Sequence, residues 1–389
     1  MENSTLLFTS VAVICRSYPS IGALSHITQS IDAYLDPSTT WTIPDACRFG
    51  SVRLLDRLAA RTATNADKEG NLEREFQLSV MTAMQVGYVE VVQWLIRRYP
   101  EGQVPSKAVA EAAKNGHLLV LQWLFTHHDH VYWGGDEMYC AVANNHLDVA
   151  KFLHEFTAPP PDDMFLIDEA ARHGDLEMMQ WLHSERGDQL TYEGVMRAVD
   201  LGYLDAVQWM MATFSESVVI KDVRMENAAA NGHLEMIKWL HWHQAWCTKQ
   251  AINRAAGNGH LEMVKGLDEQ RSEGCTTDAM DLAASNGHLE VVKWLHENRS
   301  EGCTQFAMDM AAKNGFFSVL KWLHDNRNEG CSTHAMDYAA AAGRLNIVRW
   351  LHEHCAEGCT RAAMADAIAN GHLDIARWLQ GAFPDKFGV

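Results

Sequence analysis

Two residue types with metal-binding side chains recur at regular spacing along this 389-residue chain. One position repeatedly holds histidine and another repeatedly holds cysteine: His154, His183, His241, His296, His324 and His352, then Cys247, Cys275, Cys303, Cys331 and Cys359. Imidazole nitrogens and thiolates are the ligands that zinc prefers. These residues would therefore form zinc sites if their side chains converged on common points.

The interval between equivalent residues argues against convergence. It is 28 residues in most cases, which is enough chain for one pair of helices. Equivalent residues on stacked helices are ~8–10 Å apart, whereas zinc holds its ligands at ~2.0–2.3 Å. A disulfide also needs Cα atoms within ~7 Å. We expect neither metal sites nor disulfides between equivalent positions, and we interpret the thiols as small buried groups of a reducing compartment.

Three denser clusters escape that distance argument, but none has the paired spacing of a zinc module. They are His127-His128-Asp129-His130, His241 and His243 with Cys247, and His352, His354 and Cys355 with Cys359. In the last cluster only His354 and Cys355 lie outside the recurring positions. We expect no metal and no cofactor. Because the chain also lacks a nucleophile motif and a glycine-rich phosphate loop, we expect no enzyme activity.

The recurrence belongs to a repeat that covers nearly the whole chain. Turn residues mark eleven clear copies, with a degenerate twelfth at Gly50: Gly87, Gly116, Asn145, Gly174, Gly202, Gly232, Gly259, Gly287, Gly315, Gly343 and Gly371. A period of this length is typical of a solenoid. We expect an N-terminal capping segment over residues 1–45, a repeat array over 46–380 and a tail over 381–389.

Each copy is predicted to be a helix–turn–helix unit. Around Gly287, a helix begins after the N-cap candidate Thr276, ends at Asn286-Gly287, and is followed by a second helix from about His288. The N-cap position recurs as Thr248, Thr304, Ser332 and Thr360. No unit can bury its apolar face alone, so the units must stack into an all-α solenoid.

These residues resemble the repeat of the ankyrin family. In that repeat Ala-Ala-x-x-Gly-His follows the start of the first helix, and Leu-Glu-Val-Val comes next. The matching residues are Met280, Ala283, Ala284, Gly287, His288, Leu289, Glu290, Val291, Val292 and Leu295. Two features depart from the family: Asp278-Ala-Met-Asp281 replaces its Thr-Pro-Leu-His start, and the period is about five residues shorter. We therefore expect the family's β-hairpin fingers to be reduced to short loops. The Trp-Leu-His-rich form resembles the large ankyrin families of oomycetes.

A tryptophan follows the turn by seven residues in nine copies: Trp94, Trp123, Trp181, Trp209, Trp239, Trp294, Trp322, Trp350 and Trp378. The spacing predicts an inter-repeat core element in which each ring buries ~150–250 Å². Gly266 interrupts the series. Glycine also weakens a helix by ~1 kcal/mol, so we expect the repeat around Gly266 to be soft.

Partner-binding residues should be those that vary while the framework stays constant. The residues five and two positions before each turn behave in this way. Candidates are Leu282, Met310, Tyr338, Arg254, Arg197, Glu169 and Lys313. The first three form an apolar run that is either an exposed binding patch or ordinary packing against the neighbouring helix. The family resemblance places such a patch on the concave inner-helix face.

Charge and hydropathy narrow the class of partner. The net charge is −18, which disfavours binding to phosphate backbones. No stretch has the ~18 apolar residues of a membrane span. The apolar segment 6–15 is interpreted as a capping helix, with a signal peptide as the alternative. We expect a cytoplasmic adaptor that binds an unidentified protein, while nuclear location, secretion, oligomeric state and a self-associating structural role stay open.

Overall fold

The fold was obtained as a computed structural model, which describes residues 41–62, 69–134, 136–157, 165–214 and 222–387. Most of the expected capping segment and the apolar segment 6–15 lie outside these residues. The chain divides into two compact units: residues 1–173 with 177–188, and residues 174–176 with 189–389. We call them unit 1 and unit 2 and describe each by itself.

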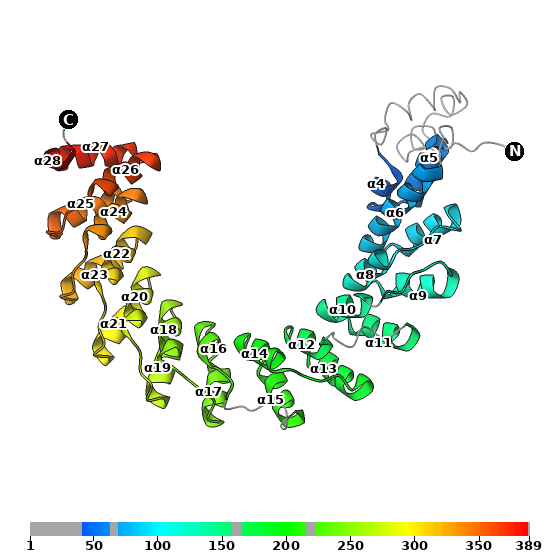
Figure 1. Cartoon of the computed structure of the whole chain (residues 1–389), viewed down its shortest axis with the longest axis horizontal. Coiled ribbons are helices and arrows are strands. Elements are labelled where there is room, and N and C mark those ends of the chain that lie inside the picture. Colours follow the sequence, from blue (N-terminus) through cyan, green and yellow to red (C-terminus); the bar gives the residue numbers. More distant parts are fainter. Residues whose placement is uncertain (1–40, 63–68, 135, 158–164, 215–221, 388–389) are drawn as a thin grey trace, which may run out of the picture. The chain divides into compact units, whose positions relative to one another are not determined.

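Within each unit, helices alternate between an inner and an outer row (Figure 1). The inner helices are α4 (Ile43–Cys47), α6 (Glu69–Val86), α8 (Ser106–Lys114), α10 (Asp136–Ala143) and α12 (Leu166–Ala171) in unit 1, then α14 (Tyr192–Asp200), α16 (Glu226–Ala230), α18 (Lys249–Gly257), α20 (Thr277–Ser285), α22 (Gln305–Asn314), α24 (Thr333–Ala341) and α26 (Arg361–Ala369) in unit 2. Successive inner helices pack directly on one another within each unit.

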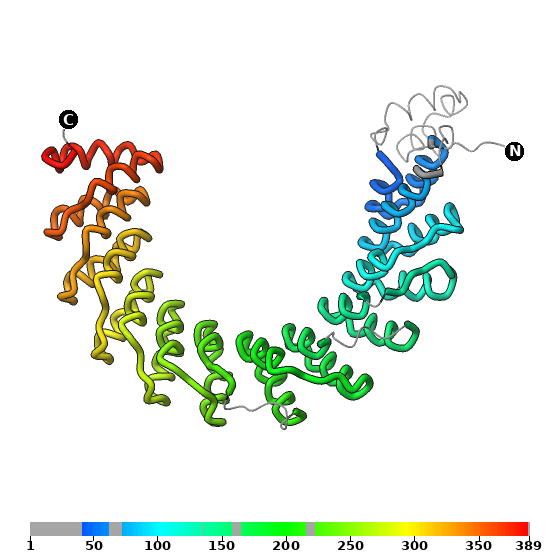
Figure 2. The backbone as a smooth tube through the Cα atoms, viewed as in Figure 1, coloured from blue at the N-terminus to red at the C-terminus, as the bar shows by residue number. Residues whose placement is uncertain are grey.

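The outer helices follow the turns. They are α5 (Val52–Thr62), α7 (Val89–Arg98), α9 (Leu118–His127), α11 (Leu147–Phe156), α13 (Leu176–Trp181) with the π-helical turn η3 (Leu182–Arg186), α15 (Leu204–Thr213), α17 (Leu234–Trp242), α19 (Leu261–Gln270), α21 (Leu289–Asn298), α23 (Phe317–Asn326), α25 (Leu345–His354) and α27 (Leu373–Ala382). A short helix, α28 (Pro384–Phe387), lies in the expected tail. The predicted all-α helix–turn–helix repeat is confirmed, and the tube in Figure 2 shows the alternation within each unit.

Every predicted turn residue has a left-handed backbone, including Gly50 of the degenerate copy and the single asparagine, Asn145. A second constraint acts at Gly287, where φ is +83° and a Cβ atom would lie 2.4 Å from the Phe316 ring of the next repeat. The preceding Asn286 donates through Nδ2 to the carbonyl oxygen of Gly257, in the previous repeat, at 2.7 Å. The Asn-Gly pair therefore ends a helix and also joins neighbouring repeats.

The predicted N-caps are confirmed, and they explain the departure from the family's helix start. The hydroxyl of Thr304 accepts from the backbone N–H of Phe306, which caps α22. The same Thr304 donates through its backbone N–H and its hydroxyl to the two carboxylate oxygens of Asp281, both at 2.8 Å. Asp281 is buried on α20, one repeat earlier. The aspartate thus replaces the usual start with an inter-repeat clamp.

Alanine, valine, leucine, isoleucine and methionine make up most of the fully buried core, and the tryptophans are less deeply buried. Ala283, Ala284 and Val292 are fully buried, and alanine pairs at equivalent positions allow the inner helices to approach closely. The nine tryptophans are partly exposed, although most of each side chain is buried. The rings of Trp322, Trp350 and Trp378 each meet a histidine of the preceding repeat, as expected for an inter-repeat element.

The links between repeats are short. Each unit holds an isolated parallel bridge between consecutive links: Val104 with Val131 in unit 1 and Arg224 with Trp246 in unit 2. The part of the chain that the structure describes contains no extended strand. None of its helices is long and apolar enough to cross a membrane.

Candidate functional site

The residue five positions before each turn residue is more exposed to solvent than the residue that follows it. All eleven are exposed or half-buried: Thr82, Glu111, Cys140, Glu169, Arg197, Asn227, Arg254, Leu282, Met310, Tyr338 and Asp366. The next position along each inner helix is buried, as Ala198, Ala255 and Ala283 illustrate. The inner helices therefore place the most variable residue of the repeat on an accessible surface. We call the part of this surface formed by Arg197, Asn227, Arg254, Leu282, Met310 and Tyr338 in unit 2 the inner-helix face.

The start of the inner-helix face contains an open pocket of about 710 Å³. Helices α14, α16 and α18 form it together with the links before α16 and α18. Trp246, from the link before α18, is half exposed at its edge. The lining residues are Tyr192, Glu193, Met196, Arg197, Asp200, Arg224, Glu226, Asn227, Trp246, Thr248, Gln250 and Arg254. Two predicted partner-binding residues, Arg197 and Arg254, thus come together in one hollow.

Polar side chains from three repeats are linked across the floor of this pocket. Arg254 donates through Nη1 to Asn227 Oδ1 at 2.6 Å, and Asn227 donates through Nδ2 to Asp200 Oδ2 at 2.8 Å. Burial raises the pKa of Asp200, although the bond from Asn227 acts in the opposite direction. Its other oxygen, Oδ1, is buried without a hydrogen-bond partner among the described residues. The pocket therefore presents exposed arginines above a partly buried carboxylate.

The predicted apolar run lies on the next three inner helices, α20, α22 and α24. Leu282 and Tyr338 are each 37% exposed, and Met310 is half-buried. The base of Leu282 packs on α18, because a Cβ atom at Gly257 would lie 3.0 Å from Leu282 Cβ. Both alternatives of the sequence analysis thus hold in part: the side chains touch the neighbouring helix and also present apolar surface to solvent.

Lys313 and His334 flank Tyr338, the last residue of the run. Lys313 Nζ lies 5.3 Å from the centre of the Tyr338 ring, within cation–π distance. On the other side, His334 stacks on Tyr338 with ring centres 5.2 Å apart. These neighbours fix the orientation of the tyrosine without covering it.

One candidate residue is separate from the others. Glu169 lies on α12 in unit 1, where it forms an ion pair with Arg172 at 2.8 Å. Arg197, Arg254, Leu282, Met310, Tyr338 and Lys313 all belong to unit 2. The structure therefore assembles six of the seven candidates on contacting helices.

The recurring histidines serve as framework. His296, His324 and His352 each meet a tryptophan of the next repeat edge-on, with ring centres 5.2, 5.1 and 5.4 Å apart. His354 points instead to the carbonyl oxygen of Trp350, at 2.9 Å. In the cluster considered for metal, the histidines therefore have other partners.

Cys355, the other residue without a framework explanation, has neighbours that the sequence analysis missed. Its sulfur lies within 4.8 Å of the Cys331 sulfur and of a Glu357 carboxylate oxygen. Among the described residues this is the one group of three potential metal ligands. The signal that could have found it is the 28-residue interval, because Cys355 aligns with Arg327, Arg299 and Arg271.

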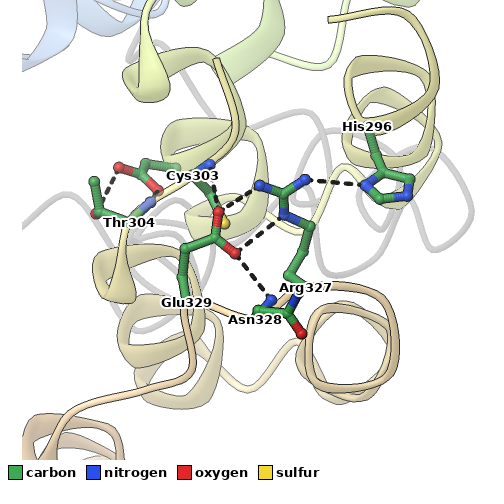
Figure 3. A network of polar contacts seen from close by, with 7 residues as sticks. His296, Cys303, Thr304, Arg327, Asn328 and Glu329 are labelled. Carbon is green, nitrogen blue, oxygen red and sulfur yellow. Dashed lines mark hydrogen bonds and ion pairs between the residues drawn. The ribbon is translucent and has the colours of Figure 1, made fainter. Parts of the chain in front are cut away.

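Those arginines form an ion-pair ladder after the outer helices. Arg327 binds Glu329 through Nε, at 3.2 Å, and through Nη2 (Figure 3). Its Nη1 reaches His296 Nδ1 of the preceding repeat at 3.2 Å, and Glu329 accepts from the backbone N–H groups of Asn328 and Cys303. One repeat earlier, the hydrogen bonds of Arg299 lower the pKa of Glu301 to about 2. The ladder ties each link to the preceding repeat.

Comparison with known protein families identifies the type of repeat. A family model described as ankyrin repeats (3 copies) matches residues 225–305 and 308–387, and another described as ankyrin repeats (many copies) matches residues 138–183. The matches cover both units and together more than half of the chain. No curated protein matches the chain.

Proposed function

Because the chain belongs to the ankyrin-repeat family, we propose that it is a non-catalytic protein-binding scaffold or adaptor. Ankyrin repeats generally mediate protein–protein interactions. The partner would lie along the inner-helix face of unit 2. The observation that carries this proposal is the exposure of the position five before each turn, which varies in type while the residue after it is a buried alanine in every copy.

The inner-helix face divides into two chemically different parts, and each would select a different feature of the partner. Leu282, Met310 and Tyr338 would receive apolar side chains, since partly exposed large apolar groups gain most from being covered. The pocket at Arg197 and Arg254 would receive polar or acidic groups that complement its exposed arginines. Such a division favours one binding orientation.

The test replaces the apolar run by Asp in a triple variant, Leu282→Asp, Met310→Asp and Tyr338→Asp. A matched control introduces the same three charges at exposed outer-row positions of the same repeats: Asn298→Asp, Asn326→Asp and Asn346→Asp. We expect affinity capture to lose its partner with the first variant only, while far-ultraviolet circular dichroism shows equal helicity for both.

Other results would contradict the proposal. If both variants keep the same partner, the inner-helix face does not bind it. If the captured species is only a second copy of the chain, the repeat array is self-associating and the adaptor role is wrong. Sedimentation of the purified protein distinguishes that case.

A further inference from the structure

The last two links of the array bring together a cluster of soft and acidic ligands. Cys331 precedes α24 and is 2% exposed, Cys355 follows α25 and is half-buried, and Glu357 is exposed. One ligand atom from each lies within 4.8 Å of the other two. Cys331 Sγ is 3.7 Å from Glu357 Oε2. The cluster is thus open to solvent on one side and enclosed on the other.

The equivalent place in the preceding repeats is occupied differently. Each has a buried cysteine, an arginine and a glutamate: Cys275 with Arg299 and Glu301, then Cys303 with Arg327 and Glu329. In both, the guanidinium hydrogen-bonds the carboxylate and also reaches the thiol. In the last copy the arginine is replaced by Cys355. A positive charge is therefore missing between a carboxylate and a thiol, and a second thiol stands in its place.

We propose that Cys331, Cys355 and Glu357 bind a thiophilic divalent cation of the zinc class. The cation supplies the charge that the guanidinium supplies in the two preceding repeats. Two thiolates and one carboxylate oxygen are established types of zinc ligand, and water completes a tetrahedral site at the exposed side. Zinc–sulfur bonds of ~2.3 Å place two sulfurs ~3.8 Å apart, so the present separation needs a closure of at most about 1 Å.

Binding of a cation to this site is linked to pH, because zinc binds thiolates and not thiols. Since metal binding releases thiol protons, affinity should increase with pH.

This site would also stabilise the end of the array. It joins the link before α24 to the link after α25. One repeat earlier, Glu329, paired with Arg327, accepts from the backbone N–H of Cys303 and joins the corresponding links. A cation that binds the folded chain better than the unfolded chain raises the melting temperature. The inference does not depend on the proposed protein-binding function, because none of its residues lies on the inner-helix face.

The test uses the full chain in a thiol-free reductant, with zinc in equilibrium dialysis and cobalt(II) as a spectroscopic probe. We expect the wild type to bind one more equivalent of zinc than Cys355→Arg, which restores the arginine of the preceding repeats. Only the wild type should give the sulfur-to-cobalt charge-transfer band. The reciprocal variant Arg327→Cys, which places a thiol near Cys303 and Glu329, should add a second equivalent.

The difference in zinc binding between the wild type and Cys355→Arg excludes zinc bound at other histidines and cysteines, because both proteins contain those residues. The metal-free melting temperature of Cys355→Arg should equal or exceed that of the metal-free wild type, which shows that the variant folds. Equal zinc binding by the wild type and Cys355→Arg would overturn the proposal. So would a mass spectrum showing a Cys331–Cys355 disulfide in protein purified with reductant, since the pair would then not be available to a cation.

Discussion

The inter-repeat clamp at Asp309 predicts a large effect of removing one side chain. Asp309 is 6% exposed and accepts from the backbone N–H of Ser332 at 2.8 Å and from its hydroxyl at 2.5 Å. Hydrogen bonds to a charged group contribute ~1.5–3 kcal/mol each. The cost of burying the carboxylate offsets part of this. We expect Asp309→Ala to lower the free energy of unfolding by ~2–4 kcal/mol.

The chain itself supplies the matched control. At the equivalent position of an earlier repeat, Asn253 accepts from the backbone N–H of Thr276 at 3.0 Å and donates to its hydroxyl at 2.8 Å. An amide therefore satisfies both partners in this geometry. We expect Asp309→Asn to cost less than ~1 kcal/mol, since two neutral hydrogen bonds remain.

Urea denaturation followed by circular dichroism measures the difference between the two variants, and hydrogen exchange of the amides of residues 332–341 localises it. The alanine variant should exchange faster there than the asparagine variant. If both variants lose the same stability, or if Asp309→Ala is neutral, the clamp does not hold the repeats together. An equal loss in both variants would point to the missing charge of Asp309 and not to its hydrogen bonds.

Three further predictions concern the framework. Gly287→Ala should lower the melting temperature more than Gly371→Ala, because both residues have φ near +82° but only Gly287 faces a ring, that of Phe316; equal losses would leave the ring contact without effect. The amides of residues 258–270 should exchange hydrogen faster than those of 287–297, because Gly266 replaces the tryptophan; slower exchange would contradict this. The pKa of Glu301 is lowered to about 2 by Arg299, so its ionised form stabilises the fold fully above pH 4.5 and loses this contribution as pH falls toward 2. Acid unfolding of Glu301→Gln should lack that component, and an unchanged acid transition would refute the assignment.

The sequence predicted what depends on neighbours along the chain. Turn residues at Gly287 and its equivalents, the N-cap at Thr304 and the two-helix unit are local properties, and all agree with the structure. The exposure of the variable positions followed from the same helical period, because the residue after each of them is a buried alanine. Which protein meets that surface is not encoded in the repeat.

What the sequence analysis missed lies between repeats. Asp281 looked like a loss of the family's helix start, because its partner Thr304 is 23 residues further on. Cys355 was grouped with the nearby His354, although its neighbour in space is Cys331, one repeat earlier.

Photo-crosslinking in cell extract tests the central claim most directly. A photoreactive amino acid replaces Tyr338 on the inner-helix face in one sample and Asn326 on the outer helix α23 in another. The account predicts a discrete protein adduct from position 338, absent at position 326, and lost when Leu282→Asp and Met310→Asp are added. Adducts of equal yield from both positions, or from position 326 alone, would contradict the claim that unit 2 binds its partner on the inner-helix face.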